Sequence, residues 1–385
     1  MGAGPAGSLC AHRLACGGAS VLLLDRARFP RDKPCGGGVT IRAARLAPFA
    51  LDPVVEDRVE RVELRFGYGR RRDRVCAQPV ILMTQRRRLD RFLAEQAAAA
   101  GAEFRDGARV TGVAAVGERV VAEVDGRRVS GLVLVGADGA NGTTARSLHL
   151  CEGPVYGVAL EGCLAPDSAT LGRYRGGVVF ELGNVPGGYG WVFPKAEHLN
   201  VGVGGLADEA PRLRDHLRRL CAGHGFRFED LHALRGYRLP LARADAVLAH
   251  GRTLVVGDAA GLVDPLSGDG IYGAFLSARL AADATLDVLA GRAADGEPYA
   301  AALRGALGRE RALSWAAKVA LERFPRALWI AAGTELAQDA LERLARGEPR
   351  PVGTRARSRL AVALLRAALR AGRTDWSARY AATSL

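Results

Sequence analysis

Lysine is almost absent from this chain of 385 residues, and it contains neither long apolar runs nor paired cysteines. All but three of the 54 basic residues are arginine, and they accompany heavy use of alanine and glycine. This composition indicates a coding bias rather than a surface evolved for phosphate contacts. The net charge of +13 therefore predicts no nucleic-acid partner, although it remains compatible with anionic lipid or diphosphate partners.

The lack of long apolar segments argues against a transmembrane protein, because a spanning helix needs roughly 18 apolar residues. No signal peptide is recognisable at the glycine-rich start. The seven cysteines are scattered without a CxxC pair, which argues against a zinc site and a disulfide scaffold. We therefore expect a cytoplasmic protein, and peripheral contact with the inner face of the membrane stays open.

Hydrophobic periodicity organises the chain into two kinds of segment. Helices are predicted up to about residue 16, over 86–100 and over 268–289, and short strands are predicted at 20–24, 110–116, 120–124, 132–135 and 253–256. Residues 152–243 alternate apolar and small residues, which is typical of an antiparallel sheet. The predicted fold is α/β. Residues 1–60, 85–150 and 244–295 form a discontinuous Rossmann-like domain, 61–84 and 151–243 an inserted substrate-binding sheet domain, and 296–385 a helical C-terminal region.

The first chemical motif is a G-x-G-x-x-G loop formed by Gly2, Gly4 and Gly7, with Ala6 inside it. Glycines at this spacing permit a tight turn and a close backbone approach to a pyrophosphate, which the following helix N-terminus stabilises. Asp25 ends the next strand and is placed to accept hydrogen bonds from a ribose 2′-hydroxyl. The combination predicts dinucleotide binding.

Two later motifs indicate which dinucleotide is bound. The first, GADGAN, follows a strand and places Asp138 where the chain turns past the cofactor. The second, GDAAG, carries Asp258, whose carboxylate can hold ribityl hydroxyls, and Gly268 follows ten residues later. Backbone N–H groups at Gly270 and Ile271 open a helix and can face the pyrimidine edge of a flavin, where reduction places negative charge.

These three segments resemble the FAD fingerprints of glutathione-reductase-type flavoproteins, in the branch of hydroxylases, halogenases and geranylgeranyl reductases. Two further segments, KPCGGG at 33–38 and GYGWVFPK at 188–195, look like those typical of geranylgeranyl reductases. The resemblance covers residues 1 to about 290. It departs from the family pattern at Asp25 and Asp269, where Glu is commoner, and at Leu89, where the R-x-x-F-D pattern has Phe.

By this resemblance, FAD is the cofactor. The same resemblance implies that FAD is lined by Asp25, Cys35, Gly36, Gly38, Arg86, Val110, Asp258, Gly270 and Ile271. Val110 would offer backbone groups to the adenine.

Cys35 is the candidate catalytic residue, because a small polarizable thiol beside the flavin could gate it or donate a proton. A buried structural cysteine is the alternative. Tyr189, Trp191 and Phe193 alternate at period two, so one strand face carries all three rings. They are candidate substrate-binding residues for an isoprenoid chain, or a plain aromatic core. Lys195 after them is interpreted as a phosphate contact or a solvated side chain.

The resemblance implies that reduced FAD saturates isolated C=C bonds of a prenyl (geranylgeranyl-type) chain, in a prenylated small molecule or lipid. NAD(P)H or a ferredoxin-like donor would reload the flavin. An aromatic monooxygenase or a halogenase shares the three fingerprints, but the KPCGGG and YGWVFP segments argue against both. A non-catalytic flavoprotein or an inactive relic is the third alternative.

Two terminal features complete the expectations. In this fold the glycine loop follows a central strand, of which roughly five residues are missing before Gly2. We therefore expect the true start to lie upstream of Met1, and the longer chain to hold more FAD. At the other end, residues 359–370 mix arginine with apolar residues, which indicates a packing helix or a membrane-surface anchor.

Overall fold

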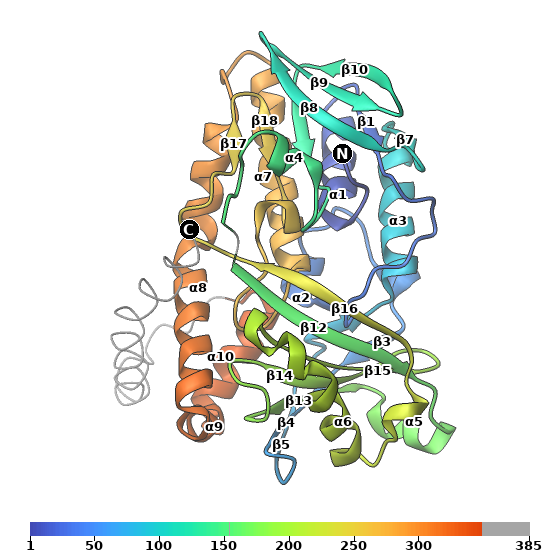
Figure 1. The fold of residues 1–385 in the computed structure, drawn as a ribbon, viewed down its shortest axis with the longest axis vertical. Helices are drawn as coiled ribbons and strands as arrows, with labels where there is room; N and C mark the ends of the chain where they lie inside the picture. The colour runs from blue at the N-terminus through green and yellow to red at the C-terminus, as the bar shows by residue number, and fades with distance from the viewer. Residues whose placement is uncertain (154, 349–385) are drawn as a thin grey trace.

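A computed structural model of the chain describes residues 1–153 and 155–348. An upper part of helices and short sheets lies above one wide sheet, and long helices run along one side of both (Figure 1). The chain passes between the two parts several times, so each is built from segments that are distant in the sequence. This arrangement is the predicted α/β fold with a discontinuous nucleotide-binding part, an inserted sheet and a helical C-terminal region.

The upper part contains two short parallel strand pairs. In the first, β1 (Leu22–Leu24) pairs with β7 (Glu103–Arg105). In the second, β11 (Leu134–Gly136) pairs with β18 (Thr253–Val255), which also pairs antiparallel with β17 (Ala249–His250).

Met1 and Gly2 lie between these two pairs. Gly2 N donates to Leu24 O at 2.6 Å on one side, and Ala137 N donates to Met1 O at 2.7 Å on the other. The glycine loop therefore starts at the centre of the upper part.

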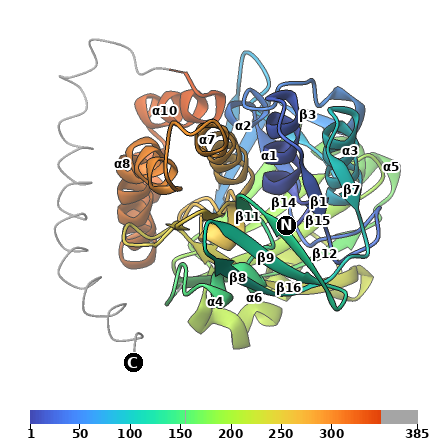
Figure 2. The same cartoon turned by 90° about the horizontal axis from the view of Figure 1, so that it is seen from above.

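Helices cover these strands closely. Helix α1 (Pro5–Cys16) packs between α3 (Arg86–Ala99) and α7 (Ile271–Leu289) (Figure 2). Buried alanines such as Ala281 and Ala282 let α7 approach its neighbours, and Gly17 leaves room for Leu286. A meander of β8 (Val110–Val116), β9 (Arg119–Val124) and β10 (Arg127–Gly131) lies above β1. The predicted hairpin at Asp125-Gly126 is confirmed, with φ of 49° and 76°.

The lower part is a seven-stranded sheet in the order β16-β12-β15-β14-β13-β4-β5. Its strands are β4 (Arg61–Phe66), β5 (Arg70–Val75), β12 (Val155–Leu164), β13 (Gly177–Leu182), β14 (Tyr189–Pro194), β15 (Leu199–Leu206) and β16 (His232–Leu241). Every neighbouring pair is antiparallel except β13 with β4. Helix α6 (Leu213–Gly223) packs on one face through Leu217 and Leu220.

A small sheet joins the two parts. Strand β6 (Ile81–Met83) pairs with β2 (Gly38–Thr40) and with β3 (Asp57–Val59), so the end of the 61–84 segment lies outside the seven-stranded sheet. Short helical turns connect the strands. They are α2 (Ile41–Ala44), η1 (Asp52–Val54), α4 (Thr143–Ser147), α5 (Ser168–Tyr174), η2 (Ala207–Arg212), η3 (Phe228–Asp230) and η4 (Gly257–Ala260).

Up to residue 348, three helices follow α7: α8 (Glu297–Arg323), α9 (Pro325–Ala332) and α10 (Glu335–Arg346). Helix α8 runs beside both parts (Figure 1). Among the described residues, no helix is long and apolar enough to span a bilayer. The predicted helix at 359–370 lies outside the described residues.

Candidate functional site

The glycine loop is tightly folded at the start of α1. Gly2 has φ +91°, and a Cβ atom at Gly7 would overlap Gly2 O. No side chain caps the N-terminus of α1 at Gly4. The first-turn N–H groups therefore face an open side of the loop, which suits an anion.

Two arginines lie beside this helix terminus. Their guanidinium groups are 3.3 Å (Arg31) and 3.8 Å (Arg86) from the position that a Cβ atom of Gly4 would take. Both bind the fully buried Asp90: Arg86 through two hydrogen bonds of 2.7 and 2.8 Å, and Arg31 at 2.9 Å. Burial opposes the charge of Arg86, but the Asp90 carboxylate outweighs it and raises the pKa of Arg86. Arg31 also lies 3.8 Å from Asp25, so the two arginines share two carboxylates, and their guanidinium groups beside Gly4 suit a pyrophosphate.

Asp25 lies at the end of β1, and its carboxylate is held by backbone groups. Its Oδ2 accepts a hydrogen bond from Ala3 N at 2.8 Å and its Oδ1 accepts one from Ala27 N at 2.9 Å. The carboxylate is therefore fixed next to the glycine loop, on the side where the sequence predicts a ribose. Val110 begins β8 nearby and packs in the same apolar cluster as Met1.

A cavity of about 650 Å³ is lined by the second and third motifs, including Gly139, Asn141 and Asp258. Lys33 Nζ donates to Asp258 Oδ2 at 2.6 Å. Burial opposes ionisation of Asp258, but Lys33 outweighs it and lowers the pKa of this carboxyl. The KPCGGG segment is thus tied to the GDAAG motif by an ion pair, and Asp258 is ionised in the cleft.

Asp138 has a structural role that the sequence motif did not predict. Its Oδ2 accepts hydrogen bonds from Thr143 N, Thr144 N and Thr144 Oγ1 at 2.7–3.0 Å, which holds the first turn of α4. Its Oδ1 is buried and has no partner among the described residues. That oxygen lies against Gly142, where a Cβ atom would overlap it.

At the start of α7, residues of the third motif hydrogen-bond to one another. Asp269 Oδ1 accepts hydrogen bonds from Ile271 N at 2.9 Å and Tyr272 N at 3.1 Å, so the Ile271 amide already has a partner. Gly270 N makes no hydrogen bond within the described part of the chain. Gly268, with φ +68°, lies next to the Tyr189 hydroxyl, which donates to Ser267 O.

The KPCGGG loop lies between the upper part and the sheet. Cys35 is half-buried, and its Sγ accepts a hydrogen bond from Gly37 N at 3.4 Å. A Cβ at Gly36 would come within 2.9 Å of the Phe193 ring, and one at Gly37, where φ is +69°, would overlap Thr84 O. Only glycine allows the loop to lie this close to both neighbours.

Lys195 corrects the sequence interpretation. It is neither a phosphate contact nor a solvated side chain, because it is 2% exposed and donates to Gly36 O at 2.6 Å and Thr84 O at 2.9 Å. Burial lowers the pKa of Lys195 to about 8. The amine therefore fastens the end of β14 to the glycine-rich loop.

The three aromatic residues of β14 share one sheet face, as predicted. Ring centroids are 6.0 Å apart for Tyr189 and Trp191 and 6.3 Å apart for Trp191 and Phe193. The Trp191 ring lies over Gly202 of β15, where a Cβ would overlap it. Contact with Gly36 shows that this aromatic face is directed toward the KPCGGG loop.

Glu161 is a candidate functional residue that the sequence reasoning missed. It is 6% exposed on β12, and its carboxylate accepts hydrogen bonds from Cys35 N at 2.7 Å and from the Tyr237 hydroxyl at 3.1 Å. Burial raises the pKa of Glu161, and burial also raises the pKa of Tyr237 well above its ordinary value. The signal available was a lone carboxylate in the otherwise uncharged strand 155–164.

Comparisons with known proteins agree with this arrangement. A family described as FAD binding domain matches residues 1–160. The menaquinone reductase of Mycolicibacterium smegmatis is 34% identical over 304 residues, which cover 74% of this chain and 74% of that protein. The geranylgeranyl diphosphate reductase of Rhodobacter capsulatus is 33% identical over 306 residues, 77% of this chain and 76% of its own.

A solved structure shares the fold. The geranylgeranyl bacteriochlorophyll reductase-like protein of Thermoplasma acidophilum superposes with a TM-score of 0.76 at 22% identity, covering 86% of this chain and 88% of its own. Fold, motifs and relatives agree, and the chain belongs to the geranylgeranyl reductase family of FAD-dependent oxidoreductases.

Proposed function

We propose that this protein reduces isolated C=C bonds in the prenyl chain of a lipophilic substrate. The observation that carries the proposal is the aromatic face of Tyr189, Trp191 and Phe193, directed toward the KPCGGG loop. Relatives named for menaquinone and for geranylgeranyl diphosphate support a substrate with an isoprenoid chain. Affinity for such a chain would come from burying CH₂ groups, at roughly 0.8 kcal/mol each.

Bound FAD would supply the reducing electrons. The α1 terminus with Arg31 and Arg86 would hold its pyrophosphate, and Asp25, fixed beside the loop, would hold its adenosine ribose. Asp258, Gly268, Gly270 and Ile271 would lie along its other end. Gly270 N is the amide that remains free there among the described residues, whereas Ile271 would contribute through the shape of the turn.

Three side chains near the loop could hold the proton that the second carbon needs. Tyr237 keeps its proton at neutral pH, and its hydroxyl hydrogen-bonds to Glu161, whose pKa burial raises. Tyr237 Oη would transfer the proton to the second carbon, and Glu161 would assist through its hydrogen bond to the Tyr237 hydroxyl. Cys35 Sγ, held by Gly37 N, is the alternative donor and the proposed catalytic thiol.

The electron donor and the cellular setting belong to the same proposal. NAD(P)H or a ferredoxin-like protein would reload the flavin. A substrate embedded in lipid would bring the protein to the membrane surface, where its excess of positive charge favours anionic headgroups.

The test is to incubate the chemically reduced, FAD-loaded protein with prenylated quinones, prenyl diphosphates and prenylated lipids under anaerobic conditions. The expected result is a product heavier by two hydrogen atoms from at least one class. Unchanged prenyl chains in every class, together with substrate-dependent oxygen uptake in air, would support the monooxygenase or halogenase alternative instead. A purified protein without bound flavin would point to the inactive relic.

A further inference from the structure

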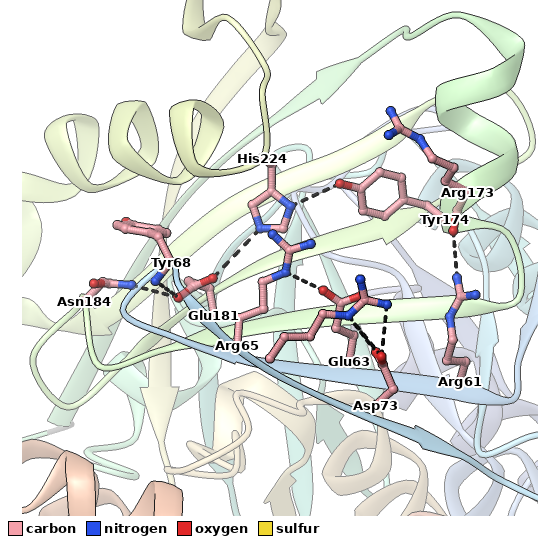
Figure 3. Close-up of polar contacts among 11 residues, drawn as sticks. Arg61, Glu63, Arg65, Tyr68, Asp73, Arg173, Tyr174, Glu181, Asn184 and His224 are labelled. Carbon is pink, nitrogen blue, oxygen red and sulfur yellow. Dashed lines mark hydrogen bonds and ion pairs between the residues drawn. The ribbon is translucent and has the colours of Figure 1, made fainter.

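A second polar cavity lies on the opposite face of the seven-stranded sheet. Its volume is about 380 Å³, and it is lined by β4, β5, β13 and α5 (Figure 3). In β13, Phe180 packs against Tyr189 and Phe193 of the aromatic face. Its neighbours Val179 and Glu181 therefore point to the other side, where α6 packs. The sheet separates this cavity from the KPCGGG loop.

Four arginines line the cavity, and only part of their charge is neutralised. They are Arg61, Arg65, Arg71 and Arg173. Glu63 is ion-paired with Arg65 and, at 3.5 Å, with Arg71, which also contacts Asp73 at 2.9 Å. Neither Arg61 nor Arg173 has a carboxylate within 4.0 Å in the described part of the chain. Of the four arginines, Arg61 and Arg173 are thus the two without a paired carboxylate among the described residues.

The two unmatched arginines are held in place. Arg61 Nη2 donates to Arg173 O at 2.7 Å, and Arg173 Nη2 donates to Thr170 Oγ1 at 3.0 Å. Gly177 makes room for the Arg61 guanidinium, because a Cβ atom there would lie 2.8 Å from its Nε and Nη2 atoms. Arg61, packed against Gly177, would lose little conformational freedom when an anion binds, whereas Arg173 is exposed.

Two aromatic rings lie on another side of the cavity. Tyr174 lines it, and its hydroxyl lies 3.1 Å from Nδ1 of His224 (Figure 3). Burial, assisted by Arg65, lowers the pKa of His224 to about 3, so the imidazole is neutral. Burial raises the pKa of Glu181, which lies 4.0 Å from the other ring nitrogen. A bound anion would therefore meet the guanidinium groups of Arg61 and Arg173 and a neutral tyrosine, while Glu181 is hydrogen-bonded to Tyr68 N and Asn184 Nδ2.

We propose that this cavity binds a phosphate or diphosphate group, at a site separate from the flavin cleft. Two guanidinium groups without a carboxylate partner match a group with two negative charges, and planar guanidinium pairs phosphate oxygens in bidentate fashion. The volume is at the small end for ligand pockets, which suits a diphosphate rather than a whole dinucleotide. The group belongs to a free inorganic anion or to the head of a prenyl diphosphate.

Isothermal titration calorimetry of the FAD-loaded full-length protein tests the site with three probes: inorganic phosphate, inorganic diphosphate and geranylgeranyl diphosphate. We expect saturable binding of diphosphate, weakened at least tenfold by Arg61→Gln and by Arg173→Gln. The matched control is Arg70→Gln, because Arg70 is on the same β4–β5 hairpin, pairs with Phe66 and lies outside the cavity. Its binding constant should equal that of the unmodified protein, and all three variants should retain their FAD.

The three probes also distinguish the source of the group. Equal losses for inorganic and prenyl diphosphate would assign the site to the diphosphate head of either ligand, and a loss only for inorganic anions would assign it to a free anion. No saturable binding of any probe would overturn the proposal. So would binding that both Arg61→Gln and Arg173→Gln leave unchanged while they keep their FAD and their melting temperature. Prenyl reduction is not needed for any of these readouts, so failure here is separate from failure of the proposed reaction.

Discussion

Glu161 connects a loop and a strand that are 126 positions apart, by accepting the Cys35 N–H. Glu161→Gln keeps a hydrogen-bond acceptor for Cys35 but removes the titratable carboxyl. We expect FAD content and melting temperature close to those of the unmodified protein, and single-turnover prenyl reduction at least tenfold slower, because general acid–base groups contribute a factor of about 10²–10⁴. Glu161→Ala should in addition lower stability by about 1–3 kcal/mol, because the part-buried Cys35 N–H loses its partner. An unchanged turnover rate in Glu161→Gln would leave Glu161 a purely structural role.

A second prediction, independent of the one for Glu161, concerns Cys35. Its Sγ accepts a weak hydrogen bond from Gly37 N and is half-buried, so Cys35→Ala removes little packing. Turnover should fall far more than the flavin-to-protein ratio measured by absorbance. Cys10→Ala, at a cysteine buried on α1, is the matched control that should leave turnover unchanged. If both variants retain full activity, Cys35 is a structural thiol.

Gly37 tests how closely the loop must lie against its neighbours. It combines φ +69° with a position where a Cβ would overlap Thr84 O, whereas Gly18 combines φ +81° with open space. Gly18→Ala should cost only the left-handed backbone penalty of about 1–2 kcal/mol. Gly37→Ala should cost more and displace Lys195, which lowers both melting temperature and FAD content. Equal losses in the two variants, measured by thermal unfolding, would show that the overlap is relieved without consequence.

Strands and helices with a clear hydrophobic period could be predicted from the sequence. The contacts between these elements could not. The alternation in β14 correctly placed three rings on one face, and the apolar stripe of α3 correctly predicted a helix over 86–100. Cofactor and substrate contacts of the named site residues stay predictions.

The contacts of Glu161 and Lys195 could not be derived from the sequence. Their partners are backbone atoms of Cys35, Gly36 and Thr84, and a backbone amide or carbonyl leaves no side-chain signal to read. The anion cavity was missed for a related reason. Arg61 and Arg173 come from different elements, and in a chain this rich in arginine neither stands out.

For the whole molecule, two buried lysines join distant parts. Lys195 ties the large sheet to the glycine-rich loop, and Lys318 on α8 donates to Gly187 O at 2.7 Å, before β14. Burial lowers the pKa of each amine to about 8 from 10.5. Between these values the unfolded chain binds more protons than the folded one, so their contribution to stability increases as pH rises from 8 to 10.5.

This linkage is testable by chemical denaturation at several pH values. The difference in unfolding free energy between the unmodified protein and Lys195→Met should grow in favour of the unmodified protein across this interval, by up to roughly 3 kcal/mol at about 1.4 kcal/mol per pKa unit. Lys318→Met should show a change of the same sign. Lys33→Met is the control, because Lys33 is more exposed than either amine. A difference independent of pH for both buried lysines would contradict the lowered pKa values.

Strand β13 presents Phe180 to the aromatic face and Val179 to the anion cavity. The same strand therefore contacts both proposed ligands, the prenyl chain on one face of the sheet and the anion on the other. If a prenyl chain moves Phe180 and thereby shifts β13, the fit of an anion on the far side must change by some factor. Thermodynamic reciprocity then requires the anion to change the affinity for the prenyl chain by that same factor. An enzyme built this way would sense diphosphate concentration through the face of the sheet opposite its aromatic residues.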